Sequence, residues 1–162
     1  MKQLTRRLQM RRWSFLVALA ICSVNGPTAV AETKLNIAEF RGKVLVVDFW
    51  ASWCVPCRRS FPWMNEMQKR YGDEGLVIIG VNLDADPEEA ESFLREVPAN
   101  FRILRDPEGD LAKSYDVIAM PSSFVFDRNG EVAKKHHGFK VRKQDEYEAI
   151  LVDLLRQSKE SG

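Results

Sequence analysis

Two short runs of almost continuously apolar residues most constrain the fold of this chain. Val44–Trp50 and Leu76–Asn82 each consist largely of valine, leucine and isoleucine. Runs of this kind are typical of strands that are buried on both faces, as in a sheet covered by helices. The sequence therefore predicts two central strands in an α/β domain.

Helices and further strands are predicted around these two runs. The segment after the first run contains two cysteines and begins a helix that extends to about Tyr71. Asp86, Pro87 and Glu89 combine a cap, a first-turn proline and a capping-box acid, so they predict a helix over 87–96. Strands are expected at 101–104, 122–127 and 131–137, with helices at 110–115 and 144–157. This order predicts one α/β domain with a central mixed β-sheet flanked by helices.

The N-terminus has the three parts of a secretory signal. A basic region ends at Arg12, an apolar stretch covers 13–24, and Ala29-Val-Ala31 precedes Glu32. This succession is typical of a signal peptide. We therefore predict that residues 1–31 are a signal peptide cleaved after Ala31, and that the exported domain comprises 32–162. The alternative is a retained membrane anchor, although the apolar stretch is shorter than the roughly 20 residues of a spanning helix.

The charge of the chain is unevenly distributed. The sequence has 24 Lys and Arg and 23 Asp and Glu, and residues 1–31 hold five of the basic side chains and no acidic one. The remaining 19 basic and 23 acidic groups give the body a net charge of −4. A nucleic-acid-binding protein needs a basic face for phosphate contacts, so the acidic body argues against nucleic acid as a partner.

The cysteines of the exported domain indicate a reactive role instead of a structural one. Cys22 leaves with the predicted signal, so the exported domain keeps Cys54 and Cys57. A structural disulfide stabilises mainly by closing a long loop of the unfolded chain, and a bridge between these two would close a minimal one. The pair is therefore either a redox couple or half of a metal site.

The spacing of the pair favours redox chemistry. Two cysteines at i and i+3 in the first turn of a helix lie close enough to form a disulfide. The helix N-terminus favours a thiolate at Cys54, which makes it the accessible nucleophile, while Cys57 resolves the mixed disulfide. The intervening Val55-Pro56 has no histidine or lysine to stabilise the thiolate further, so the motif favours a reductant over an oxidant.

Asp48 and Pro121 are further candidates. Asp48 lies on the first predicted strand among apolar residues, where burial would raise its pKa and let it accept the Cys57 proton. The alternative is a solvated acid at a strand edge. Pro121 begins a strand; a cis bond there would hold the Met120 backbone against a client, but trans is the default for an X–Pro bond.

The chain resembles a known family in this region. Val44 to Arg58 is similar to the active-site strand and helix of the thioredoxin fold, and Trp53-Cys-Val-Pro-Cys57 looks like the TlpA/ResA-like branch of exported thiol–disulfide oxidoreductases. The resemblance covers about 35–157, including Gly42-Lys43 and the segment 115–127. It implies a thioredoxin fold and a periplasmic, monomeric thiol–disulfide oxidoreductase without cofactor or metal.

The resemblance also implies roles for individual residues. Pro121 would be the cis-proline beside the active site, which overrides the trans default. The residues expected to contact a client are Trp53, Val55, Pro56 and Met120. Asp48 is similar to the buried aspartate of thioredoxins proper, where exported relatives often carry asparagine. Some relatives have an acidic residue after the second strand; Asp84 and Asp86 lie there, and Asp86 is better explained as a helix cap.

Three functions remain open from the sequence. The favoured one is a dithiol reductase that acts on disulfide-containing clients, for which apocytochrome c and copper-site assembly proteins are candidates. It would be recharged by a membrane electron donor of the DsbD/CcdA type. The second is a net disulfide donor with the same residues. The third is a copper-handling protein in which His136 or His137 joins Cys54 and Cys57, although we expect the two histidines on opposite faces of a strand.

Overall fold

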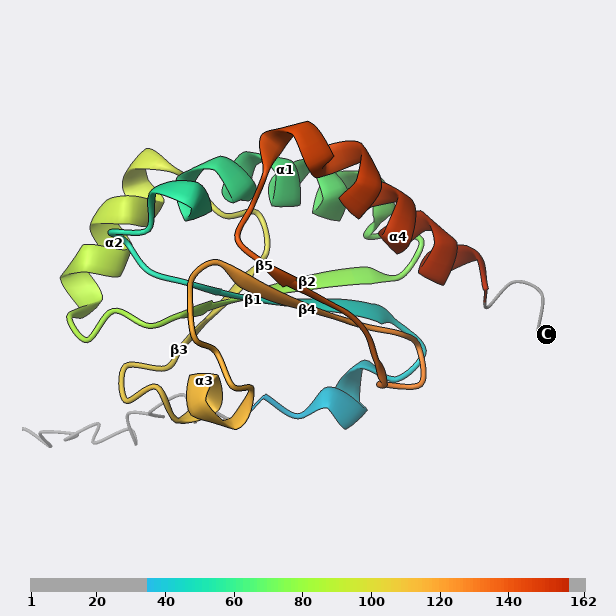
Figure 1. The fold of residues 1–162 in the computed structure, drawn as a ribbon, viewed down its shortest axis with the longest axis horizontal. Helices are drawn as coiled ribbons and strands as arrows, with labels where there is room; N and C mark the ends of the chain where they lie inside the picture. Colours follow the sequence, from blue (N-terminus) through green and yellow to red (C-terminus); the bar gives the residue numbers. More distant parts are fainter. Residues whose placement is uncertain (1–34, 158–162) are drawn as a thin grey trace, which may run out of the picture. The chain divides into compact units, whose positions relative to one another are not determined.

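A five-stranded mixed sheet forms the centre of the domain (Figure 1). The computed structural model describes residues 35–157, so the predicted signal peptide, 1–31, lies outside the described residues. The strands are β1 (Val44–Trp50), β2 (Leu76–Asn82), β3 (Arg102–Arg105), β4 (Ser122–Phe126) and β5 (Val132–His137), in the order β3-β2-β1-β4-β5. β1 is parallel to β2 and antiparallel to β4, while β2–β3 is parallel and β4–β5 antiparallel. The predicted mixed sheet is confirmed.

Helices cover both faces of the sheet. The helices are α1 (Val55–Tyr71), α2 (Pro87–Glu96), α3 (Asp110–Ser114) and α4 (Gln144–Arg156). In Figure 1, α1, α2 and α4 lie on one side of the sheet and the short α3 lies on the other, with the 3-10 turn Ile37–Phe40. Two separate apolar clusters fill the two sides. β1 is buried along its whole length, because both of its faces are covered.

The predicted boundaries agree closely with the structure. β1, β2 and α2 have the predicted bounds, and Asp86 caps α2 by accepting the Glu88 amide hydrogen at 2.9 Å. β3 begins and ends one residue later than expected, and α3 and α4 each end one residue earlier. The 3-10 turns Ile37–Phe40 and Val141–Lys143 were not predicted, because turns this short have no apolar periodicity.

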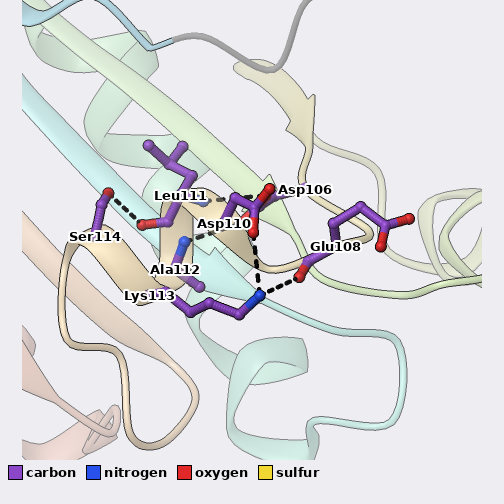
Figure 2. Close-up of polar contacts among 7 residues, drawn as sticks. All are labelled: Asp106, Glu108, Asp110, Leu111, Ala112, Lys113 and Ser114. Atoms are coloured by element: carbon purple, nitrogen blue, oxygen red, sulfur yellow. Dashed lines mark hydrogen bonds and ion pairs between the residues drawn. The ribbon is translucent and has the colours of Figure 1, made fainter.

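A buried aspartate fixes the start of α3. Asp106 accepts the amide hydrogens of Leu111 at 3.2 Å and Ala112 at 2.8 Å (Figure 2). The carboxylate thereby satisfies amide groups that the first turn of a helix leaves without partners. On the outside of the same turn, Lys113 contacts the Glu108 carbonyl oxygen and the Asp110 carboxylate. Within 35–157, no helix is long and apolar enough to cross a bilayer.

Candidate active site

The cysteine pair lies where β1 ends and α1 begins. Cys54 is the N-cap of α1, and its Sγ accepts the amide hydrogen of Cys57 at 3.3 Å. A disulfide joins the two cysteines, whose Cα atoms are 5.3 Å apart. Pro56 occupies the first turn, a position that needs no amide hydrogen. The helix N-terminus favours negative charge on Cys54 after reduction.

Both cysteines are buried, although Cys54 was predicted to be accessible. Cys54 exposes 3% of its surface and Cys57 none, because both belong to the apolar cluster under α1. Two large apolar side chains are exposed: Trp53, which precedes Cys54, at 69%, and Ile118, in the loop before β4, at 87%. Val55 is also exposed, and the side chain of Met120 packs against the cluster that contains both cysteines. Trp50, in contrast, is part of the core.

The Met120–Pro121 peptide bond is cis, the isomer that the resemblance implied. Pro121 is buried at the start of β4, and its carbonyl oxygen accepts the amide hydrogen of Gly138 at 2.8 Å. The next residue, Ser122, donates its hydroxyl hydrogen to the Ala119 carbonyl oxygen at 2.7 Å. Hydrogen bonds on both sides of the cis bond therefore hold the loop that precedes β4.

Asp48 is buried in the middle of the sheet, so the alternative of a solvated strand-edge acid is wrong. Its side chain exposes 1% of its surface. Ser123 on β4 donates a hydrogen bond to Oδ1, and Oδ2 has no hydrogen-bond partner among residues 35–157. Burial raises the pKa of Asp48 to about 7, against the opposing effect of the Ser123 hydrogen bond. The carboxyl group therefore changes protonation state near neutral pH.

Asp48 lies in the wall of a pocket between the sheet and the helices α1 and α4. Ser60 of α1 also lines this pocket, and its hydroxyl donates to the carbonyl oxygen of Cys57 at 3.0 Å. His136 of β5 and Tyr147 of α4 also line this pocket, and their rings are 4.8 Å apart. Ser60 thus contacts both the pocket that contains the buried carboxyl group and the backbone of Cys57.

The two acidic residues that follow β2 have different roles in the structure. Asp84 is buried, and its carboxylate accepts hydrogen bonds from three groups: the Ser52 amide, the Ser52 hydroxyl and the Asn82 side-chain amide, the last at 2.7 Å. It therefore anchors the loop that leads from β1 to Trp53 and Cys54. Asp86 is exposed and caps α2. The sequence indicated the cap, but the role of Asp84 depends on a contact between residues 32 positions apart.

The two histidines do not approach the cysteines as a ligand set. His136 packs on Tyr147, whereas His137 Nδ1 is 3.1 Å from the Ser122 hydroxyl oxygen. Consecutive residues of a strand face opposite sides. Among residues 35–157, no three His, Cys, Asp or Glu side chains are grouped to hold a metal ion.

The sequence matches the redoxin family over residues 22–151. The chain belongs to the redoxin family. It is 32% identical over 115 residues to the thiol–disulfide oxidoreductase ResA of Bacillus thuringiensis subsp. konkukian, covering 70% of this chain and 66% of that protein. It is 28% identical over 101 residues to ResA of Bacillus subtilis, covering 62% and 56%. The chain thus spans somewhat less than two thirds of the length of these curated redoxins.

Solved structures confirm the thioredoxin-like architecture of this redoxin. A Chlorobium tepidum protein assigned as thiol:disulfide interchange protein DsbE is 44% identical, with a TM-score of 0.72, over 75% of this chain and 86% of that one. StoA from Bacillus subtilis is 27% identical, with a TM-score of 0.57, over 66% and 82%. The predicted resemblance to the TlpA/ResA-like branch is therefore confirmed.

Proposed function

We propose that this redoxin is an exported, periplasmic thiol–disulfide oxidoreductase that reduces disulfides in client proteins. The observation that carries the proposal is the Cys54–Cys57 disulfide at the N-terminus of α1, in a domain that also has a cis-proline before β4. The family relationship supports the same chemistry. The predicted signal peptide, 1–31, supports export.

The reaction proceeds through two thiol–disulfide exchanges. The Cys54 thiolate attacks one sulfur of the client disulfide, forms a mixed disulfide and releases the other client sulfur as a thiolate. The Cys57 thiol then loses its proton, and its thiolate attacks the Cys54 sulfur. The Cys54–Cys57 disulfide forms, the mixed disulfide breaks, and the client leaves fully reduced. A membrane electron donor of the DsbD/CcdA type would return two electrons to the pair.

Asp48 accepts the Cys57 proton in this scheme. Its burial raises its pKa to about 7, so near neutral pH a substantial fraction is carboxylate and can act as a base. Oδ2 has no partner in the described structure and is free to take a proton. Ser60 links the two parts of the site, since it lines the Asp48 pocket and contacts the Cys57 carbonyl oxygen.

The apolar surface around the disulfide is the proposed client site. Trp53, Val55 and Ile118 are exposed, and Met120 lies at the cis-proline loop. Exposed apolar groups beside a reactive centre are typical of a protein-binding surface. They suit an unfolded or extended client segment such as that of apocytochrome c or a copper-site assembly protein.

The direction of electron transfer, from this protein to its client, follows from the weak stabilisation of the Cys54 thiolate. Val55 and Pro56 offer no charge between the cysteines. Arg58, the nearest cation in sequence, forms an ion pair with Glu96 at 2.8 Å on the side toward α2. A thiolate that is weakly stabilised leaves the disulfide form favoured, which makes the dithiol a reductant.

Cysteine variants test the exchange scheme. With an oxidised peptide that carries one disulfide, Cys57→Ala should accumulate a covalent protein–peptide adduct, because the resolving thiol is absent. Cys54→Ala is the matched control and should form none. An adduct with Cys54→Ala but not with Cys57→Ala would overturn the assigned roles. Export is tested by N-terminal sequencing of the protein from a periplasmic extract, where Glu32 is expected as the first residue.

A further inference from the structure

Asp48, Ser123 and His136 form one row across the sheet. Asp48 pairs with Ser123 in the β1–β4 register, and Ser123 pairs with His136 in the β4–β5 register. Directly paired residues on neighbouring strands project from the same face. Since strands lie about 4.8 Å apart, the backbone positions of Asp48 and His136 are about 10 Å apart. The row starts at the central strand and ends at the edge strand.

All three residues of the row line the same pocket. The pocket is partly open to solvent. Asp48 forms the buried end, whereas His136, on the edge strand, is half-buried. Most of the remaining wall is apolar: Trp63, Met64, Val125 and Leu151. The polar side chains therefore form a strip along which water has hydrogen-bonding partners.

Because Asp48 is buried, its proton needs a path of polar groups to reach solvent. Asp48 can accept the Cys57 proton only as a carboxylate, and with a pKa of about 7 it reaches that state by exchanging its proton with solvent. Its side chain has almost no contact with solvent. The Ser123 hydroxyl is the hydrogen-bond partner found for it among the described residues, and a hydroxyl both accepts and donates a proton.

We propose that His136 relays the proton of Asp48 to solvent, by way of the Ser123 hydroxyl and water in the pocket. This proposal rests on the proposed reductase function and on Asp48 as the proton acceptor. The Cys57 proton passes to Asp48, from Asp48 through the hydroxyl and water to the His136 ring, and from the ring to solvent. When the membrane donor reduces the Cys54–Cys57 disulfide, Cys57 leaves as a thiolate and regains a proton along the same path in reverse. No group of the relay therefore changes its charge over a complete cycle, and the electron pair moves only between sulfur atoms.

The surroundings of His136 suit this role. Burial and the nearby Lys134 lower the pKa of His136, so at neutral pH the ring is uncharged and can accept a proton. Five titratable groups besides Asp48 lie near it: Lys134 and, on the opposite face, His137 of β5, Lys143 before α4, and Glu146 and Tyr147 on α4. The α1 residues that line the pocket, Ser60, Trp63 and Met64, carry no charge.

The test is the rate of mixed-disulfide resolution in a single turnover at neutral pH, in dilute buffer. His136→Phe keeps an aromatic ring against Tyr147 but cannot carry a proton. We expect it to slow resolution by about tenfold, less than the roughly 100- to 10,000-fold contributed by a direct general acid or base, because the ring acts one step away from Asp48. Added imidazole should restore the rate, because it can accept the proton from water where the pocket opens to solvent. His137→Phe is the matched control; it changes the neighbouring ring on the opposite face, and neither the rate nor the response to imidazole should change.

Two results would overturn the relay. The first is a rate for His136→Phe equal to that of the unaltered protein in dilute buffer. The second is a slowed rate that imidazole does not restore, since that indicates a structural effect. Asp48→Asn in the same assay separates the two proposals. If it slows resolution while His136→Phe does not, only the relay fails; if it has no effect, Asp48 is not the acceptor and both fail.

Discussion

The hydroxyl of Ser123 donates a hydrogen bond to the buried carboxyl group of Asp48, across the antiparallel pairing of β4 with β1. The two residues are 75 positions apart in sequence. This bond favours the carboxylate, whereas burial favours the protonated acid. The pKa of Asp48, and with it the pH at which the site gains a base, depends on the balance between these two effects.

Ser123→Ala should therefore move the pH dependence of resolution upward. Without the hydroxyl, burial acts on Asp48 unopposed, and its pKa rises above the value of about 7. The rate of mixed-disulfide resolution should rise with pH in both proteins, with a higher midpoint in the variant. Rates measured between pH 5 and 9 check this. An unchanged or lower midpoint would show that the hydrogen bond does not tune the acceptor.

Asp48→Asn should stabilise the oxidised protein at alkaline pH. The folded pKa of Asp48 is raised from 3.8 to about 7, so the unfolded chain ionises first and stability falls as the pH rises between these values. Full ionisation in the folded state costs up to about 4 kcal/mol, since one pKa unit corresponds to about 1.4 kcal/mol. Urea unfolding at pH 4 and pH 8.5 measures the difference, which should appear only at pH 8.5. An equal difference at both values would contradict a raised pKa.

Asp84→Ala should weaken the loop that carries Trp53 and Cys54. Removal of the carboxylate leaves the Ser52 amide without its partner, at a cost of about 1–3 kcal/mol. We expect lower stability in urea and a slower reaction with a disulfide peptide. Asp86→Ala is the matched control, because it removes the cap of α2 at about 1 kcal/mol and should leave the peptide reaction unchanged. Equal effects of both variants on the reaction would argue against a role of Asp84 in positioning the loop.

Ile118→Lys should impair client recognition without impairing the disulfide chemistry. Ile118 is 87% exposed, and exposed substitutions usually change stability by no more than about 0.5 kcal/mol. The reaction with an apolar disulfide peptide should slow severalfold, while the reaction with a small soluble disulfide should keep its rate. The ratio of the two rates is the measurement. Equal slowing with both substrates would place the effect at the cysteines instead of the client surface.

The sequence predicted those features that depend on local pattern. β1 and β2 were placed at their observed bounds, since a continuous apolar run is distinctive, and Asp86 combined with Pro87 marked the start of α2. The cysteine spacing indicated the redox pair. The cis isomer at Pro121 followed from the family resemblance alone, because the local sequence favours trans.

Features that depend on strand register or packing were not predicted. The contact between Ser123 and Asp48 follows from the pairing of β1 with β4, which no local pattern specifies. The anchoring of Ser52 by Asp84 likewise joins the ends of two strands. Cys54 was expected to be accessible, but its side chain turns into the apolar cluster under α1, a matter of tertiary packing. The pocket that combines Asp48 with His136 exists only once α4 covers the sheet.

The reduction potential of the Cys54–Cys57 pair tests the central claim most directly. The protein would be equilibrated against a glutathione or dithiothreitol redox buffer, and the ratio of disulfide to dithiol would be measured by thiol alkylation. With no charge between the cysteines, we predict a potential near that of thioredoxin, about −270 mV, as a reductase requires. A potential near about −120 mV would contradict the account and identify the protein as a disulfide donor.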